Sequence, residues 1–144
     1  MALYYKKQKN VVLLGSKAGT TRTSAALTSG YTDNTKTIET GDWSKINLDV
    51  LYTMGSAETS NSIEVQVQCS PDGTNFYNIP NESASGGTST LTAREFTFVG
   101  TNAAAATISI GLDIFYKYVK VSAKETGVAS NVGSVFIEAT LSGS

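Results

Sequence analysis

The sequence predicts an all-β protein, an antiparallel β-sandwich of jelly-roll or immunoglobulin-like type with an extended N-terminal arm. Three observations support this fold class. Apolar and polar residues alternate in seven or eight short segments after residue 42. Thirteen glycines and a large share of Ser and Thr favour tight turns and pleated strands. No long segment has the apolar spacing of a helix, and 144 residues suffice for one hydrophobic core.

Taken in chain order, the alternating segments predict strands in which every second side chain enters the core. The clearest case is residues 63–70, where Ile, Val, Val and Cys alternate with Glu, Gln, Gln and Ser. The expected strands are residues 46–53, 63–70, 76–79, 95–98, 107–114, 118–122 and 135–141.

The connections between these strands carry turn-forming residues. Residues 70–73 place Pro and Gly as a tight turn requires, and residues 126–127 and 131–133 bracket the link to the last strand. Residues 81–88 are expected to form a flexible polar loop, and residues 100–106 a connection of small, mainly apolar side chains.

Residues 1–41 differ from the rest and are interpreted as an arm or extended lead-in, with the sandwich domain at residues 42–144. Residues 11–14 indicate a short buried strand, whereas residues 15–41 hold few large apolar groups. Five basic residues precede the first acidic one, Asp33. This asymmetry fits docking on an acidic neighbour or on nucleic acid, and it equally fits a solvated basic tail. The candidate partner-binding residues of the arm are Tyr4, Tyr5, Lys6, Lys7, Lys9 and Arg22.

The residue types argue against catalysis. The sequence has no histidine, which removes the commonest general base and most zinc sites. Residues 33–34 and 72–75 offer oxygens to calcium, but without the ligand count of a dedicated site. Carboxylates that could run glycoside hydrolysis fall on the polar sides of predicted strands and are expected to face solvent; these are Asp49, Glu64, Asp113 and Glu138. We therefore expect no catalytic residue, no metal and no cofactor, and predict that the protein is not an enzyme.

Cysteine usage and hydropathy bear on the cellular compartment. The single cysteine, Cys69, excludes a disulfide within the chain and is in phase with the apolar side of its strand, so a buried thiol is expected. Residues 11–14 are too short an apolar run for a secretory signal, and no stretch is long enough for a transmembrane helix. The expectation is a protein kept in a cytosol-like compartment, or released from it by assembly or lysis.

Aromatic residues near the end of the chain are the remaining candidates for a contact surface. Alternation through residues 115–121 places Tyr116 and Tyr118 on the outer side, flanking Lys117. Tyrosine beside lysine suits a protein or sugar interface, because tyrosine combines apolar area with a polar tip. Ordinary cross-strand packing is the alternative reading.

Two stretches resemble a known group of proteins. Residues 69–77 (CSPDGTNFY) resemble the Ser-x-Asp-Gly-x-x-aromatic hairpin of small β-sandwich proteins in tailed-phage virions. Residues 115–121 (FYKYVKV), followed by residues 131–135 (NVGSV), are similar to the closing strands of the same proteins. The resemblance covers residues 43–141 and concerns a turn and strands rather than a site. The same strand also resembles one in discoidin-type, galactose-binding jelly rolls, although the paired cysteines and the calcium loop often seen there are missing.

The virion resemblance implies a non-enzymatic structural protein, foremost a capsid decoration (cement) protein that binds the capsid surface through its arm and edge strands. A neck or tail accessory subunit, or a carbohydrate-binding jelly-roll module, is the alternative. The implied partners are other virion proteins, such as the major capsid protein, and further copies of the chain, with no membrane. Nucleic acid would be reached only through the basic arm. The implied location is the virion, assembled in the host cytoplasm.

Overall fold

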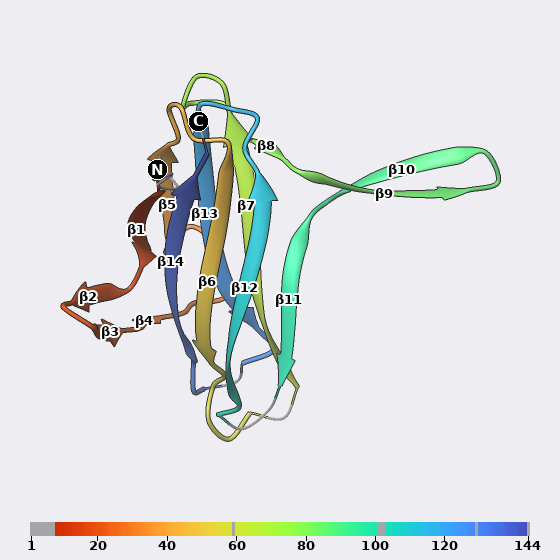
Figure 1. The fold of residues 1–144 in the computed structure, drawn as a ribbon. Coiled ribbons are helices and arrows are strands. Elements are labelled where there is room, and N and C mark those ends of the chain that lie inside the picture. The colour runs from red at the N-terminus through yellow and green to blue at the C-terminus, as the bar shows by residue number, and fades with distance from the viewer. Residues whose placement is uncertain (1–7, 59, 101–102, 129, 144) are drawn as a thin grey trace, which may run out of the picture.

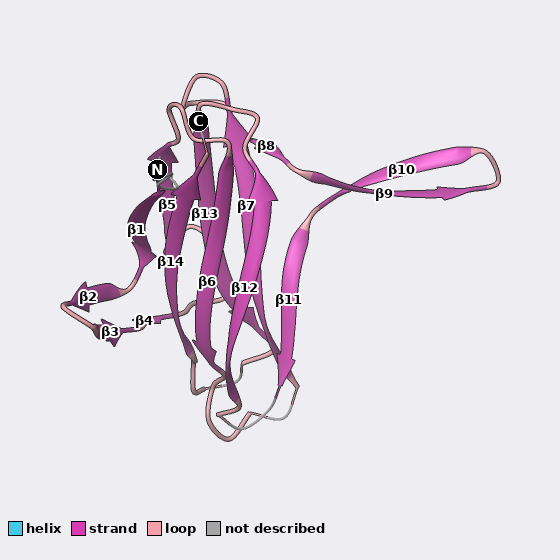
Figure 2. Ribbon diagram, in the orientation of Figure 1, coloured by secondary structure: helices cyan, strands magenta, loops and turns pink. Residues whose placement is uncertain are grey.

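The computed structural model describes residues 8–58, 60–100, 103–128 and 130–143, and all statements below concern these residues. Every regular element in them is a β-strand, as Figure 2 shows. No helix in this part of the chain is long and apolar enough to cross a membrane. The prediction of an all-β sandwich is confirmed.

Two five-stranded antiparallel sheets form the body of the molecule (Figure 1). The first sheet runs in the order β1 (Gln8–Leu14), β14 (Ser134–Ser142), β6 (Lys45–Thr53) and β12 (Ala105–Asp113), and the short β4 (Ala25–Ala26) also pairs with β14. The second sheet runs in the order β11 (Glu95–Gly100), β7 (Asn61–Ser70), β13 (Tyr118–Thr126) and β5 (Thr35–Glu39), and the short β8 (Tyr77–Asn78) also pairs with β7.

The strand pairing is that of a jelly roll. Among the eight principal strands, the first pairs with the eighth, the second with the seventh, the third with the sixth and the fourth with the fifth. These nested pairs are β1 with β14, β5 with β13, β6 with β12, and β7 with β11. Two such Greek keys folded face to face define the jelly roll, which decides between the two sandwich types left open by the sequence.

The core follows the alternation along the strands. In β7, Ile63, Val65 and Val67 are buried, while the polar residues between them are only half-buried. The inward side chains of β6, β13 and β14 meet those of β7 between the sheets, and together they form one hydrophobic cluster. Burial of this apolar surface is the main stabilising contribution to the fold.

The segment predicted to be an arm or extended lead-in contributes strands to both sheets of the sandwich. β1 and β5 are edge strands of the two sheets, and Leu13, Leu27 and Ile38 enter the core. The expected boundary at residues 41/42 therefore does not divide the described chain into two units. An edge strand turns only every second side chain toward the core, so the few large apolar residues of this segment are enough to pack its strands against the sandwich. The buried strand expected at residues 11–14 is confirmed within β1.

Two further hairpins lie outside the sandwich sheets. One consists of β2 (Ser16–Ala18) and β3 (Thr21–Thr23), the other of β9 (Pro80–Ser85) and β10 (Thr88–Ala93), and each forms a two-stranded sheet of its own. They leave the sandwich on opposite sides (Figure 1). The prediction of a flexible loop at residues 81–88 is therefore wrong, because most of this segment is strand β9. The connection expected at residues 100–106 is shorter than predicted, because Ala105 and Ala106 begin β12.

Candidate interaction site

The β2–β3 hairpin is bound to the outer face of β14. Lys17 Nζ lies 2.9 Å from a carboxylate oxygen of Glu138, and the Arg22 guanidinium lies 5.6 Å from the centre of the Phe136 ring. Phe136 is fully buried although it points away from the core cluster, and Glu138 is 6% exposed. The expectation that Glu138 faces solvent is therefore wrong. It does lie on the outer side of its strand, but a hairpin more than a hundred residues earlier in the chain covers it.

Of the other three strand carboxylates, Asp49 on β6 lies directly opposite Glu138 in the strand register, whereas Glu64 and Asp113 lie elsewhere. Asp49 accepts a hydrogen bond from the Asn47 amide at 3.0 Å, Asp113 is exposed, and Glu64 lies 3.8 Å from Lys124 Nζ. Within the residues that the structure describes, no three Asp, Glu or Cys side chains gather as metal ligands would.

One carboxylate that the sequence analysis did not single out is buried at the end of the sandwich. Glu125 takes an inward position on β13 and is 1% exposed. Its oxygens accept hydrogen bonds from the Gly55 and Gly133 backbone N–H groups and from the Asn61 amide. Three donors satisfy the buried carboxyl oxygens, and they tie the loops before β7 and β14 to β13. The signal in the sequence was the polar residue at the last inward position of an otherwise apolar strand face.

The turn predicted at residues 70–73 is confirmed and links β7 to β8. Asp72 accepts hydrogen bonds from the Asn75 and Thr74 backbone N–H groups, both at 2.8 Å, and from the Asn75 amide. These donors hold the pKa of Asp72 well below its usual value, because they favour the charged form. The carboxylate is thus engaged in its own turn. The neighbouring Cys69 is buried as expected, and burial raises the pKa of its thiol.

The candidate arm residues are only partly described. Tyr4, Tyr5, Lys6 and Lys7 lie outside the described residues. Lys9 is exposed on β1, at the edge of the first sheet, and Arg22 lies on the β2–β3 hairpin against Phe136.

In the second candidate group, Tyr116 and Lys117 lie in the connection between β12 and β13, and Tyr118 is the first residue of β13. Tyr116 is 45% exposed, and Lys117 lies 3.6 Å from Glu39 in an exposed ion pair. Tyr118 is half-buried, and the Lys117 ammonium lies 5.5 Å from its ring centre. Because the chain bends here, Phe115 also turns outward and is 84% exposed, which the alternation did not predict.

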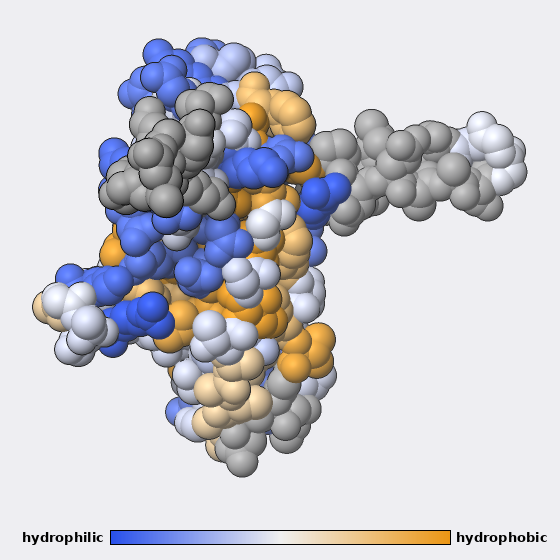
Figure 3. Space-filling view, viewed as in Figure 1, coloured by the Kyte–Doolittle hydropathy of each residue, from blue (hydrophilic) through white to orange (hydrophobic). Residues whose placement is uncertain are grey.

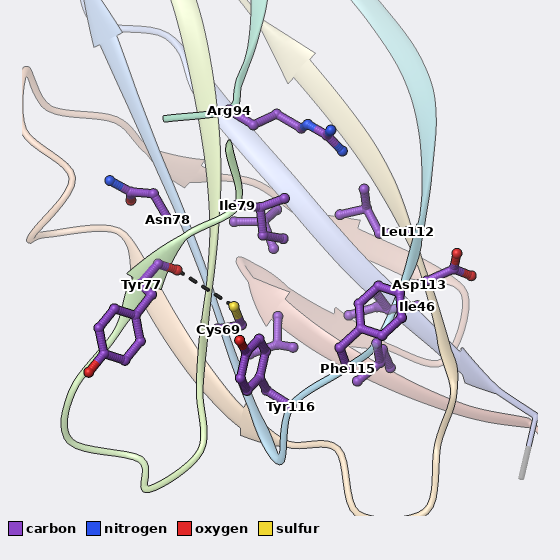
Figure 4. Close-up of a pocket in the computed structure, with 13 residues that line it drawn as sticks. Ile46, Cys69, Tyr77, Asn78, Ile79, Arg94, Leu112, Asp113, Phe115 and Tyr116 are labelled. Carbon is purple, nitrogen blue, oxygen red and sulfur yellow. Dashed lines mark hydrogen bonds between the residues drawn. The ribbon is translucent and has the colours of Figure 1, made fainter. Parts of the chain in front are cut away.

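Phe115 and Tyr116 border a pocket of about 360 Å³ at the open side of the sandwich (Figure 4). Its lining is mainly apolar and includes Ile79 and Leu112, while Arg94 extends across its upper end from the base of the β9–β10 hairpin. The pocket thus joins the end of β12 to the stem of the hairpin. The structure brings Tyr116 into this site but leaves Tyr118 beside the turn at Gly73.

These features define a jelly roll whose distinctive surfaces are two hairpins and an apolar, open side. No protein-family model matches the sequence, and no curated protein matches it. Among solved structures, the SPBc2 prophage-derived protein YomS is similar with a TM-score of 0.53 and 11% identity, over 99% of this chain and 99% of that one. Dimeric latent PorU from Porphyromonas gingivalis is similar with a TM-score of 0.51 and 11% identity, over 98% of this chain and 13% of PorU. At these identities the comparisons establish a shared fold.

Proposed function

We propose that this chain is a non-enzymatic structural subunit of a tailed-phage particle and, more specifically, a capsid decoration protein that binds the capsid surface and stabilises it. The observation that carries the proposal is the shape of the molecule. A jelly roll with a well-filled core extends the β9–β10 hairpin away from the sandwich and leaves strand edges open (Figure 1). Such hairpins and edges serve contact with neighbouring subunits.

Two further facts support a particle subunit. YomS, which shares the fold over its whole length, is a prophage-derived protein. Jelly rolls are also frequent in viral capsid domains, which is an argument from fold alone. The basic residues at the start of the chain, including Lys9, would then contact an acidic surface of the capsid protein.

The non-enzymatic part of the proposal rests on the state of the reactive groups. The oxygens of Glu125 are engaged by amides of the same chain, and those of Asp72 by its own turn. Burial raises the pKa of the Cys69 thiol, which disfavours the reactive thiolate. The sequence contains no histidine that could activate a nucleophile.

The test is the copy number of the protein in particles purified from cells that carry its gene, measured by quantitative mass spectrometry. Hundreds of copies are expected for a decoration protein. About six or twelve copies would instead indicate a symmetric neck or tail ring. Absence of the protein from the particles would overturn the proposal. Particles made without the gene should regain heat resistance when the purified chain is added.

A carbohydrate-binding module is the second candidate, because exposed aromatic residues surround the pocket. Tyr77 is 58% exposed and Tyr116 and Phe115 stand on the other side of the same pocket. Aromatic side chains present apolar faces that suit sugar rings. A glycan array with Tyr116→Ala as the comparison tests this candidate, and the absence of any bound glycan would eliminate it.

A further inference from the structure

The β9–β10 hairpin is an insertion into one edge strand of the second sheet. β8 and β11 both pair with the same strand, β7, and both run antiparallel to it. Asn78 lies opposite Gln68 and Glu95 lies opposite Gln66, so only Val67 separates the two pairings. A continuous strand would place a single residue opposite Val67, whereas this chain has residues 79–94 there. At their base, the Arg94 N–H donates to the Ile79 carbonyl at 2.8 Å.

The insertion adds little to the fold of its own chain. β9 and β10 pair with each other in six residue pairs and form a separate two-stranded sheet. The hairpin points away from the sandwich (Figure 1). An isolated two-stranded hairpin is marginally stable in water, so an extended one needs a surface to pair with or to pack on.

The same molecule offers an edge of the matching kind. β12 is the last strand of the first sheet, and its nine residues carry one charge, Asp113, at the end. Soluble proteins usually protect such an edge with charges, proline or a bulge. The inward residues Ile108 and Leu112 are only half-buried, since no strand of the described residues pairs with the outer edge of β12. Figure 3 shows hydrophobic residues gathered on this side of the molecule, below the hairpin stem.

A glycine in the middle of this edge strand is not required by the fold. Gly111 lies in β12 without a left-handed backbone, and a Cβ there would meet only the Asn47 amide oxygen, at 3.7 Å. Glycine inside a strand weakens it and is typical of places where another backbone approaches closely. The open edge, the half-buried apolar residues and Gly111 together mark β12 as an acceptor.

We propose that the β9–β10 hairpin of one chain docks on the β12 edge of a second copy of the same chain. The hairpin leads away from its own sandwich, so the edge that it can reach belongs to another molecule. Its strands of six residues fit along the nine of β12. By sequence, residues 80–93 carry one charge, Glu82, which lies in β9. The uncharged strand β10 would therefore meet an almost uncharged edge. Main-chain hydrogen bonds then extend the first sheet across the interface.

This contact joins two different surfaces, so each chain is both donor and acceptor. Reciprocal use of the contact by two chains gives a two-fold dimer, whereas head-to-tail repetition gives a closed ring or a chain of subunits. The inference supplies the self-contact of the particle subunit proposed above. It can nevertheless be tested without any particle, so its failure and that of the proposed function are distinguishable.

Two variants separate the donor from the acceptor. Deletion of residues 80–94 joins Ile79 to Glu95 and restores a continuous edge strand, with Ile79 facing Val67 and Glu95 facing Gln66. This variant keeps β12 but lacks the hairpin. Gly111→Lys places a long charged side chain on the β12 edge and keeps the hairpin. Gln8→Lys, at the exposed start of β1 on the opposite side of the sheet, is the matched control for added charge.

The experiment is sedimentation velocity of each protein alone and of the two variants mixed. The full chain and Gln8→Lys should associate, whereas the deletion and Gly111→Lys should each weaken association by about tenfold or more. The mixture should form a one-to-one complex, because one variant supplies the hairpin and the other the edge. A monomeric full chain, or association unchanged in both variants, would overturn the proposal. If circular dichroism shows that the deletion variant does not fold, the association of Gly111→Lys compared with that of Gln8→Lys still tests the proposal.

Discussion

The two hairpins outside the sandwich sheets are used in opposite ways. The β2–β3 hairpin is bound by its own chain, through the Lys17–Glu138 ion pair and the contact of Arg22 with Phe136. The β9–β10 hairpin is held at its base, where Arg94 pairs with Ile79, and points away from the sandwich (Figure 1).

The difference shows that the role of a protruding hairpin depends on whether it covers side chains of its own sandwich. Beneath β2–β3 the outer face of β14 carries a phenylalanine and a glutamate, which would be costly to expose or to leave unpaired. The first hairpin therefore stabilises the fold. Since the second replaces a single position of an edge strand, its removal is expected to leave the sandwich pairing intact, which agrees with the proposed contact with another molecule.

The largest effect that tests this comparison is expected at Phe136. Phe136→Ala should lower the free energy of unfolding by about 3–5 kcal/mol, because the side chain is fully buried under the β2–β3 stem. Phe115→Ala is the matched change at an 84% exposed phenylalanine and should cost less than about 0.5 kcal/mol. Urea unfolding, measured in the chain lacking residues 80–94 to avoid association, compares the two. Equal losses would show that the outer face of β14 is not a second buried layer.

Removal of each hairpin in turn is the next test. Replacement of residues 16–23 by two glycines should cost about 2–3 kcal/mol, because it exposes Phe136 to water. Deletion of residues 80–94 should change the free energy of unfolding by less than about 1 kcal/mol, since the core residues remain in place. Thermal unfolding at low protein concentration measures both. Comparable destabilisation by the two deletions would contradict the division of roles.

The smallest effect is expected at the ion pair that fixes the first hairpin. Lys17→Met should cost about 1 kcal/mol, because Glu138 loses its partner while Lys17 itself is partly exposed and screened by solvent. Lys36→Met, at an exposed position on β5, is the control and should be neutral. A double-mutant cycle with Glu138→Gln isolates the pair, and a coupling energy near zero would mean that the ring contact alone holds the hairpin.

Local patterns in the sequence were sufficient for the strands and for one turn. Alternation in residues 63–70 predicted both the strand and its buried side, because the side chains of a strand point alternately to its two faces. The turn at residues 70–73 followed from Pro and Gly in the same way. The strand β9 was missed because its Ser-rich segment has no apolar side to reveal the alternation.

The residue pattern along the chain was therefore enough to predict the all-β class, most of the strands and the buried side of each. The jelly-roll pairing was visible only in the folded chain, since β1 pairs with β14 across more than a hundred residues. The same holds for the cover of Glu138 by Lys17, and for the position of residues 79–94 opposite a single residue of β7. The physical reason is that alternation depends on neighbours in the chain, whereas strand pairing and the cover of a sheet's outer face depend on segments far apart in sequence.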